Sequence, residues 1–226
     1  MQCVILAAGR GVRMGKLTEG TPKPMLPIRG IPKLEYTLRA LPVEVTEVVF
    51  VIGYLGEKIR EYFGKSFDGR RITYVEQEKL NGSGGAMHLV KDVVRGKFLV
   101  IMGDDLYLKE DLERLMTHDL AVLACVVEDS NPFGVLETDV DGKLLSIIER
   151  PHDGTVKLVN TAAYMLHENF FQYPLVSISE TEYGLPQTLV SMRDKYTIAA
   201  EQTKTWFPIG TPEALAEAEQ VIEKFV

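Results

Sequence analysis

The 226-residue sequence contains only two cysteines, four histidines and one tryptophan. Cys3 and Cys125 lie in apolar, strand-like stretches, so they indicate core packing in a reducing compartment and exclude a disulfide framework. The four histidines are too far apart in the sequence to indicate a zinc site. Neither a small disulfide-rich protein nor a histidine-based metalloenzyme is expected.

Long hydrophobic runs and an excess of basic residues are also missing. No apolar run approaches the length of a membrane span, and the N-terminus enters a strand without the pattern of a signal peptide. The net charge is -7 and the pI about 5.2, whereas a general nucleic-acid binder needs a broad basic face. We therefore expect a cytoplasmic protein that binds neither nucleic acid nor membranes.

Strand-like and helix-like segments alternate along the first half of the chain, which predicts an α/β fold with a doubly wound, mostly parallel, Rossmann-like sheet and helices on both faces. Ligands of such a sheet bind at the carboxyl ends of its strands. The expected strands are 3–6, 47–52, 72–75 and 98–102, and the expected helices are 33–40, 57–63 and 85–93.

The second half has a different pattern, which predicts a small β-rich portion. Residues 133–149 are typical of a hairpin that turns at Asp141-Gly142, and residues 158–166 of a further strand. Residues 212–225 predict a closing helix with Thr211 as its N-cap. No linker composition divides the chain, so we expect one domain over residues 1–226.

A glycine-rich loop follows the first strand and carries two cations. The stretch L-A-A-G-R-G-V-R-M ends at Met14 and is followed by P-K-P-M at residues 22–25. Glycine allows the backbone to approach an anion closely, and Arg13 and Lys23 add positive charge where phosphate oxygens would lie. The loop therefore predicts a phosphate-binding site, with a purely structural glycine loop as the alternative.

Two better-known phosphate-binding loops do not fit this sequence. A dinucleotide-binding turn requires G-x-G-x-x-G, but position 14 is methionine and no acidic residue closes a second strand about 20 residues on. The P-loop pattern G-x-x-x-x-G-K-[ST] is absent as well. The sequence thus supports neither a Rossmann dehydrogenase nor a P-loop ATPase.

The combination of L-A-A-G-x-G-x-R-M with P-K-P-M resembles the sugar-1-phosphate nucleotidyltransferases, and further motifs extend this resemblance over essentially the whole chain. These enzymes join a nucleoside triphosphate to a sugar 1-phosphate and release pyrophosphate by in-line displacement. The resemblance implies that Arg13 contacts the triphosphate, that Lys23 lies near the reacting phosphates, and that the loop binds the nucleotide through Leu6, Ala8, Gly9 and Gly11. A triphosphate and a sugar 1-phosphate would then be the partners of this protein.

Asp104 follows the apolar strand 98–102, where Gly103-Asp104 matches a G-D pair of the family. The resemblance implies that Asp104 binds Mg²⁺, the expected cofactor, which typically takes one or two carboxylates together with phosphates and waters. The alternative for Asp104 is a turn residue at a strand end. Asp105 is expected to be a turn or cap residue, with a water-mediated role left open.

Gln77 precedes Gly82-Ser83-Gly84 by the interval found in relatives that use UTP. A carboxamide offers a donor and an acceptor, which match the imide edge of uracil or thymine. The resemblance thus implies that Gln77 and Gly82 bind the base, with UTP or dTTP preferred, although guanine-specific relatives exist. Ser83 is expected at the nucleotide as well, and as the cap of the helix that follows.

Later motifs resemble the sugar-binding elements of the family. The resemblance implies that the amide of Gly134 and the carboxylate of Glu149 meet sugar hydroxyls and that Arg150 holds the sugar phosphate. The further sugar-side residues it implies are Asn160, Thr161 and Glu182. Ala162 stands where the family usually has glycine.

One departure concerns the metal. In W-F-P-I-G-T-P, residues 206–212, Pro208 replaces an aspartate that is the second magnesium ligand in relatives. Three alternatives follow: one carboxylate with phosphates and water suffices, Asp105 helps indirectly, or catalysis is lost and the chain is a regulatory nucleotide-sugar-binding paralogue.

A cytidylyltransferase acting on a non-sugar phosphate is a further alternative for the function. Two helices with apolar faces leave self-association open.

Overall fold

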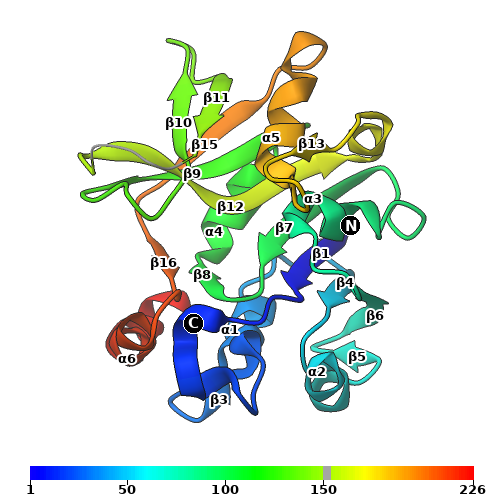
Figure 1. The fold of residues 1–226 in the computed structure, drawn as a ribbon, viewed down its shortest axis with the longest axis vertical. Coiled ribbons are helices and arrows are strands. Elements are labelled where there is room, and N and C mark those ends of the chain that lie inside the picture. The colour runs from blue at the N-terminus through cyan, green and yellow to red at the C-terminus, as the bar shows by residue number, and fades with distance from the viewer. Residues whose placement is uncertain (150–153) are drawn as a thin grey trace.

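A computed structural model describes residues 1–149 and 154–226, and its centre is a large mixed sheet (Figure 1). The strand order is β11-β10-β12-β7-β1-β4-β6-β5, with β9 paired to β12 and β15 paired to β9. The α/β fold class predicted from the sequence is confirmed.

The first half of the chain forms the parallel part of this sheet, in which β1 lies between β4 and β7. Because these strands are apolar on both faces, alternate residues enter two cores: Cys3 and Ile5 pack on one side of β1, and Val4 packs on the other. The elements are β1 (Gln2–Ala7), α1 (Lys33–Arg39), β4 (Glu47–Ile52), α2 (Gly56–Phe63), β5 (Ser66–Phe67), β6 (Arg70–Glu76), α3 (Gly82–His88) and β7 (Lys97–Met102).

Helices cover both faces of the sheet. Leu34 of α1 and Ile59 of α2 belong to the core on one face, whereas Met87 of α3 and Leu189 of α5 belong to the core on the other. The remaining helices are α4 (Lys109–Leu115), α5 (Leu185–Val190) and α6 (Pro212–Val221). Short 3-10 turns occupy Val12–Thr18, Lys23–Met25, Glu168–Gln172, Ser191–Asp194 and Ile222–Phe225.

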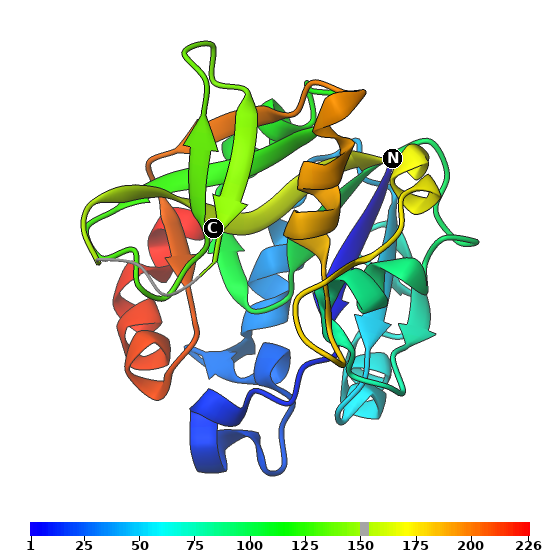
Figure 2. The ribbon, with the colours of Figure 1, turned by 45° about the horizontal axis from the view of Figure 1, so that its top comes forward.

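The second half adds antiparallel strands, and the hairpin of β10 and β11 projects from the rest of the molecule (Figures 1 and 2). The long central strand of the second half, β12, pairs antiparallel with β7, β9 and β10. The strands are β9 (Ala121–Val127), β10 (Val135–Thr138), β11 (Leu144–Ile148), β12 (Lys157–His167) and β15 (Ala199–Thr203).

Three small antiparallel pairs complete the described part of the structure. One of them, β8 (Asp105–Tyr107) with β16 (Trp206–Pro208), joins the end of β7 to the C-terminal segment before α6. The others are β2 (Pro27–Ile28) with β3 (Ile31–Pro32), and β13 (Val176–Ser177) with β14 (Tyr183–Gly184). The predicted cap of α6 is confirmed, because the Thr211 hydroxyl accepts a hydrogen bond from the Ala214 amide at 3.3 Å.

The sequence predictions differ from the structure at several elements. The helix expected at 85–93 begins at Gly82 and ends at His88. Ser83 does not cap it; the Ser83 hydroxyl instead accepts a hydrogen bond from the Leu185 amide at 3.1 Å. The strand-like stretch expected around Cys125 is β9, but the pairing of β9 with β15 was not predicted, because it joins segments far apart in sequence.

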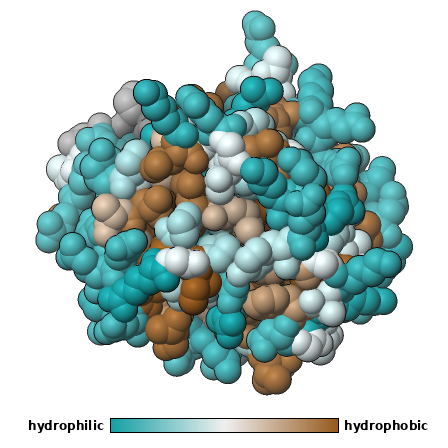
Figure 3. Space-filling model, turned by 90° about the horizontal axis from the view of Figure 1, so that it is seen from below, coloured by the Kyte–Doolittle hydropathy of each residue, from teal (hydrophilic) through white to brown (hydrophobic). Residues whose placement is uncertain are grey.

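Other composition-based expectations can be compared with the described residues. Both cysteines are free and buried. None of the helices in the described part of the chain is both long and apolar enough to cross a membrane. On the face seen from below, hydrophilic side chains surround apolar ones that gather toward the centre (Figure 3).

Candidate active site

A cleft with a volume of about 520 Å³ opens at the carboxyl ends of β1 and β7. Its lining contains every residue that the sequence predicted as catalytic or nucleotide-binding: Leu6, Ala8, Gly9, Gly11, Arg13, Lys23, Gln77, Gly82, Ser83 and Asp104. Glu182, predicted on the sugar side, lines the same cleft. The fold therefore brings together segments that are far apart in the chain.

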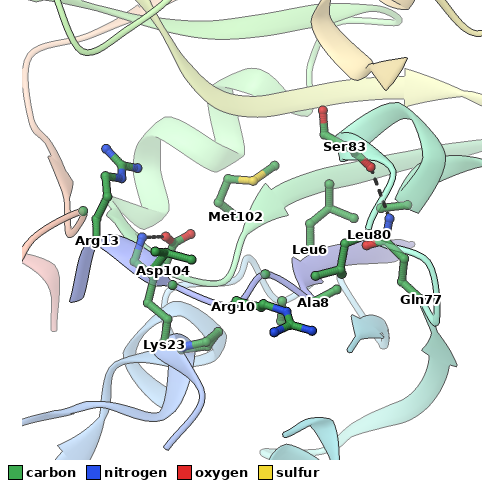
Figure 4. Close-up of a pocket in the computed structure, with 18 of the residues that line it drawn as sticks. Leu6, Ala8, Arg10, Arg13, Lys23, Gln77, Leu80, Ser83, Met102 and Asp104 are labelled. Atoms are coloured by element: carbon green, nitrogen blue, oxygen red, sulfur yellow. Dashed lines mark hydrogen bonds and ion pairs between the residues drawn. The ribbon is translucent and has the colours of Figure 1, made fainter. Parts of the chain in front are cut away.

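The cleft has two chemically different ends (Figure 4). Arg13, Lys23 and Asp104 lie together at one end, and Gln77 and Ser83 lie at the other. Between them the lining includes the apolar side chains of Leu6, Ala8 and Met102. A ligand with a charged part and a planar polar part fits this division.

The glycine loop brings Lys23 into the cleft by a close backbone approach. Gly11 has a φ of 66°, in the left-handed region that favours glycine. A Cβ at Gly11 would lie only 2.8 Å from the Cβ of Lys23, so a side chain there would push the lysine away. Arg13 lies against the C-terminal segment, since a Cβ at Gly210 would be 3.5 Å from its Nη1 atom.

Asp104 forms an ion pair with Lys23, and the two side chains are 24% and 12% exposed. Burial acts to raise the pKa of the Asp104 carboxyl, but the charges of Lys23 and Lys33, the hydrogen bond from Lys23 and the charge of Arg13 outweigh it. The pKa of Asp104 is therefore held below its ordinary value, and the carboxylate is ionised at neutral pH.

Asp105 lies beside the position where relatives carry the second metal-binding aspartate. It is directly opposite Pro208 in the pairing of β8 with β16, so the two side chains lie on the same face of that pair. Asp105 accepts a hydrogen bond from Trp206 Nε1 at 3.2 Å. Burial, and then the neighbouring Asp104 carboxylate, raise the pKa of Asp105 to about 7.

Lys33 is a charged residue of this region that the sequence analysis missed. It is fully buried at the start of α1, and its ammonium group has no hydrogen-bond partner among the described residues. One turn further along the same face of α1, the Thr37 hydroxyl donates to the Asp105 carbonyl at 3.3 Å. Burial lowers the pKa of Lys33 to about 8, against the opposing effect of the Asp104 carboxylate.

Gln77, at the other end, is only partly available to a ligand. Its Nε2 group donates to Asn81 Oδ1 at 3.1 Å. The same group donates to the Gly82 carbonyl at 3.2 Å (Figure 4). Both hydrogens of the amide are thus used within the protein, which leaves Oε1 as an acceptor. The sequence predicted a donor and an acceptor together, and this expectation is corrected to an acceptor.

The chain around Glu182 closes against the start of α3. The Tyr183 amide donates to the Asn81 carbonyl at 2.9 Å. Gly82, with a φ of 87°, approaches so closely that a Cβ there would lie 2.4 Å from the Tyr183 carbonyl oxygen. Glycine at position 82 is therefore required for this contact, which places Glu182 at the edge of the cleft.

Three predicted sugar-side residues lie together, but they do not line the cleft volume described above. The backbone N–H of Asn160 donates a hydrogen bond to the Gly134 carbonyl at 2.8 Å. A Cβ at Gly134 would lie 3.1 Å from Glu149 Oε1, so this carboxylate packs directly on the glycine. Gln187, which the sequence analysis did not select, donates to Glu149 Oε1 at 3.0 Å.

Thr161 occupies a different environment from the one expected. It is fully buried, and its hydroxyl donates to the Leu123 carbonyl at 2.8 Å. Its carbonyl accepts a hydrogen bond from the Tyr107 hydroxyl, also at 2.8 Å. A sugar phosphate cannot reach this side chain, so the prediction that Thr161 binds it is corrected to a structural role. Arg150 lies outside the described residues.

Magnesium requires oxygen ligands, of which protein carboxylates are the usual source. The described residues contain no group of three or more His, Cys, Asp or Glu side chains that could hold a metal ion by itself. Asp104, which lines the cleft with an ionised carboxylate, nevertheless fits Mg²⁺, which is commonly bound by one or two carboxylates plus substrate phosphates. Asp105 is the adjacent second carboxylate.

Comparisons with known proteins agree with this arrangement. Residues 2–224 match the nucleotidyl transferase family. The chain belongs to this family. It is 30% identical over 236 residues to the UTP–glucose-1-phosphate uridylyltransferase AglF of Haloferax volcanii, and the match covers 99% of this chain and 97% of AglF.

Two other relatives show that the family is diverse. The bifunctional protein GlmU of Methanococcus maripaludis is 32% identical over 218 residues, which cover 94% of this chain and 52% of GlmU. The chain therefore spans about half the length of the GlmU relatives it matches. A D-glycero-α-D-manno-heptose 1-phosphate guanylyltransferase of Campylobacter jejuni is 30% identical over 175 residues, which cover 76% of this chain and 78% of that protein.

Solved structures share the same fold. A crystal structure of apo UDP-glucose pyrophosphorylase superimposes with a TM-score of 0.83 at 22% identity, and the match covers 99% of this chain and 98% of that one. At this level of identity the likeness concerns the fold alone.

Proposed function

We propose that residues 1–226 form a single nucleotidyltransferase domain that joins a nucleoside triphosphate to a sugar 1-phosphate and releases pyrophosphate. The observation that carries this proposal is the convergence of Arg13, Lys23 and Asp104 at one end of the cleft, with Gln77 at the other. The charged end suits the phosphates, and the polar end suits a base. This arrangement supports the family reaction over binding of a single phosphate.

The obstacle to the reaction is repulsion between anions. Two unit charges about 4 Å apart repel by roughly 4 kcal/mol at an effective dielectric of 20, and two phosphate groups bring several such pairs together. In the proposed reaction a phosphate oxygen of the sugar 1-phosphate attacks the α-phosphorus in line. The new P–O bond forms as the bond to the β-phosphate oxygen breaks, and pyrophosphate leaves with the bonding electrons. Arg13 and Lys23 hold and neutralise the phosphates during this displacement.

Asp104, with its ionised carboxylate, is the residue that would hold Mg²⁺, and Asp105 is placed to assist it. Magnesium, when bound, supplies further positive charge to the phosphate oxygens. Lys23, now paired with Asp104, would be released toward the phosphates when the substrates bind.

For the base, we propose uracil or thymine. The free Oε1 of Gln77 is an acceptor and pairs with the imide N–H of either base. The N1–H group of guanine offers a similar donor, so GTP is the competitor to include in every test. The two free, buried cysteines suit an enzyme of the reducing cytoplasm.

A pyrophosphate-release assay tests the proposal. UTP, dTTP, CTP, GTP and ATP are each combined with a panel of sugar 1-phosphates and with phosphocholine in the presence of Mg²⁺. Turnover of a sugar 1-phosphate with UTP or dTTP supports the proposal, whereas turnover of CTP with phosphocholine alone contradicts it. Tight binding of a nucleotide sugar without turnover of any pair would support the regulatory paralogue, the alternative that Pro208 favours.

A further inference from the structure

Gln187 makes a contact that no sequence motif indicated. It lies in α5, which packs beside β11 of the projecting hairpin (Figure 2). Its Nε2 group donates to Glu149 Oε1 at 3.0 Å. The Glu149 carboxylate is thereby held between the Gln187 side-chain amide and Gly134. A Cβ added at Gly134 would lie 3.1 Å from the same oxygen. One oxygen of Glu149 is fixed, while its Oε2 atom makes none of these contacts.

The surroundings of Gln187 Oε1 indicate that the side-chain amide of Gln187 has one preferred orientation. Gln187 Oε1 is buried and has no hydrogen-bond partner among the described residues. It lies directly over Gly184, where a Cβ would be only 1.7 Å away, so the glycine leaves the space for it. Exchanging the two ends of the amide would place the carbonyl against the Glu149 carboxylate, which cannot donate.

Stability alone does not explain this residue. A buried acceptor without a partner is unfavourable, whereas an apolar side chain of similar size would avoid that cost. The compensating feature is the donor end, which orients a carboxylate at the predicted sugar side of the site.

We propose that Gln187 is a positioning residue for sugar recognition: it holds Glu149 by one oxygen and leaves the other to accept a hydroxyl of the sugar 1-phosphate. This inference rests on the proposed function. A carboxylate held in one orientation distinguishes sugars that differ in the direction of one hydroxyl, because an unmatched hydroxyl loses a charge-assisted hydrogen bond. Gln187 thus contributes to the choice of sugar and not to the chemical step.

Two variants and one control test this role. In Gln187→Glu two carboxylates would lie about 3 Å apart and repel, and in Gln187→Met the donor is lost while the volume is kept. For both variants we expect the KM for the sugar 1-phosphate to rise at least tenfold and the KM for the nucleoside triphosphate to stay within twofold. The ratio of kcat/KM between the preferred sugar and its epimer should fall. Gln172→Glu, at an exposed glutamine, is the matched control and should behave as the wild type.

The measurements on the wild type and on the variants distinguish failure of the proposed function from failure of the role of Gln187. If the wild type turns over no pair of substrates, the proposed function is contradicted and this inference is overturned with it. If the wild type is active but both variants keep its sugar KM and its epimer ratio, only the inference about Gln187 is overturned. An equal rise in both KM values with a lowered melting temperature would indicate a structural role, and would also overturn it.

Discussion

The ammonium group of Lys23 is paired with the carboxylate of Asp104, although 81 residues separate them in the chain. Lys23, which follows the glycine loop, thus neutralises Asp104, which follows strand β7. Both groups line the cleft, so phosphates and a divalent ion would compete with this pair for its two members. The pair therefore links the binding of anionic substrates to the binding of metal.

Lys23→Met should have opposite effects on turnover and on the binding of a divalent ion. The loss of one cation at the reacting phosphates is expected to lower kcat by about 10²-fold or more. Asp104 would at the same time lose its competing partner, so Mn²⁺, measured by titration calorimetry, should bind more tightly. Lys16→Met changes an exposed lysine of the same loop outside the cleft lining, and neither quantity should change. Weaker Mn²⁺ binding by Lys23→Met would contradict the competition.

Asp105→Asn should reveal the cost of a half-buried carboxylate through its pH dependence. The folded-state pKa of Asp105, about 7, lies above its ordinary value of 3.8, so the folded protein retains this proton more firmly than the unfolded chain. The resulting cost grows as the pH rises from about 4 and is complete above about pH 7. The stability gained by Asp105→Asn should thus be greater at pH 8 than at pH 5, on the order of 2 kcal/mol.

Urea unfolding at the two pH values measures this difference. Asp92→Asn, at an exposed aspartate, should change stability about equally at pH 5 and pH 8. A gain in stability from Asp105→Asn that is larger at pH 5 would contradict a raised pKa of Asp105 in the folded protein.

Lys33→Met should stabilise the protein. A fully buried ammonium, which has no hydrogen-bond partner in the described part of the chain, is replaced by an apolar chain of similar length. This change is expected to gain about 1–3 kcal/mol at pH 7. The folded-state pKa of Lys33, about 8, is below the ordinary 10.5, so the cost of the charge is complete below pH 8 and fades as the pH rises toward 10.5. The gain should therefore narrow at pH 9.5 in denaturant titrations. A destabilised variant would mean that Lys33 is needed to balance Asp104 and Asp105.

Ala162→Gly should also stabilise the fold. Ala162 has a φ of 58°, at the irregular point of β12 where its register with β9 shifts. A left-handed conformation costs a residue with a Cβ about 1–2 kcal/mol, and part of this is offset because glycine is more flexible in the unfolded chain. We expect a net gain of about 0.5–1 kcal/mol in thermal or urea unfolding. Ala163→Gly, the neighbouring buried position without a positive φ, should destabilise.

Local sequence patterns predicted the elements that position the site. The glycine loop, the Gly103-Asp104 pair at the end of an apolar strand, and the spacing of Gln77 from Gly82 each depend on residues close in sequence. Their convergence followed from the rule that parallel strands present their carboxyl ends at one edge of a sheet. The cleft lining agrees with that expectation.

Other features depend on packing between distant segments and could not be predicted. In the sequence Lys33 is a polar residue at the start of a helix. Its burial depends on the packing of α1, which contacts the first residue of β8. Gln187 acts through a contact with Glu149, 38 residues away. Thr161 carries a family motif, but the bonds to Leu123 and Tyr107 keep it inside the sheet. The replacement of glycine at position 162 was visible in the sequence, whereas the left-handed backbone there was not.

The most direct test of the central claim is pyrophosphate release by the wild type and by Asp104→Asn, at saturating Mg²⁺ and with the best substrate pair. Asparagine keeps the size of the side chain but removes the charge that Lys23 and a divalent ion share. We expect turnover to fall by at least 10²-fold, while the variant keeps its fold and still binds the nucleoside triphosphate. Turnover by Asp104→Asn at the wild-type rate would contradict it.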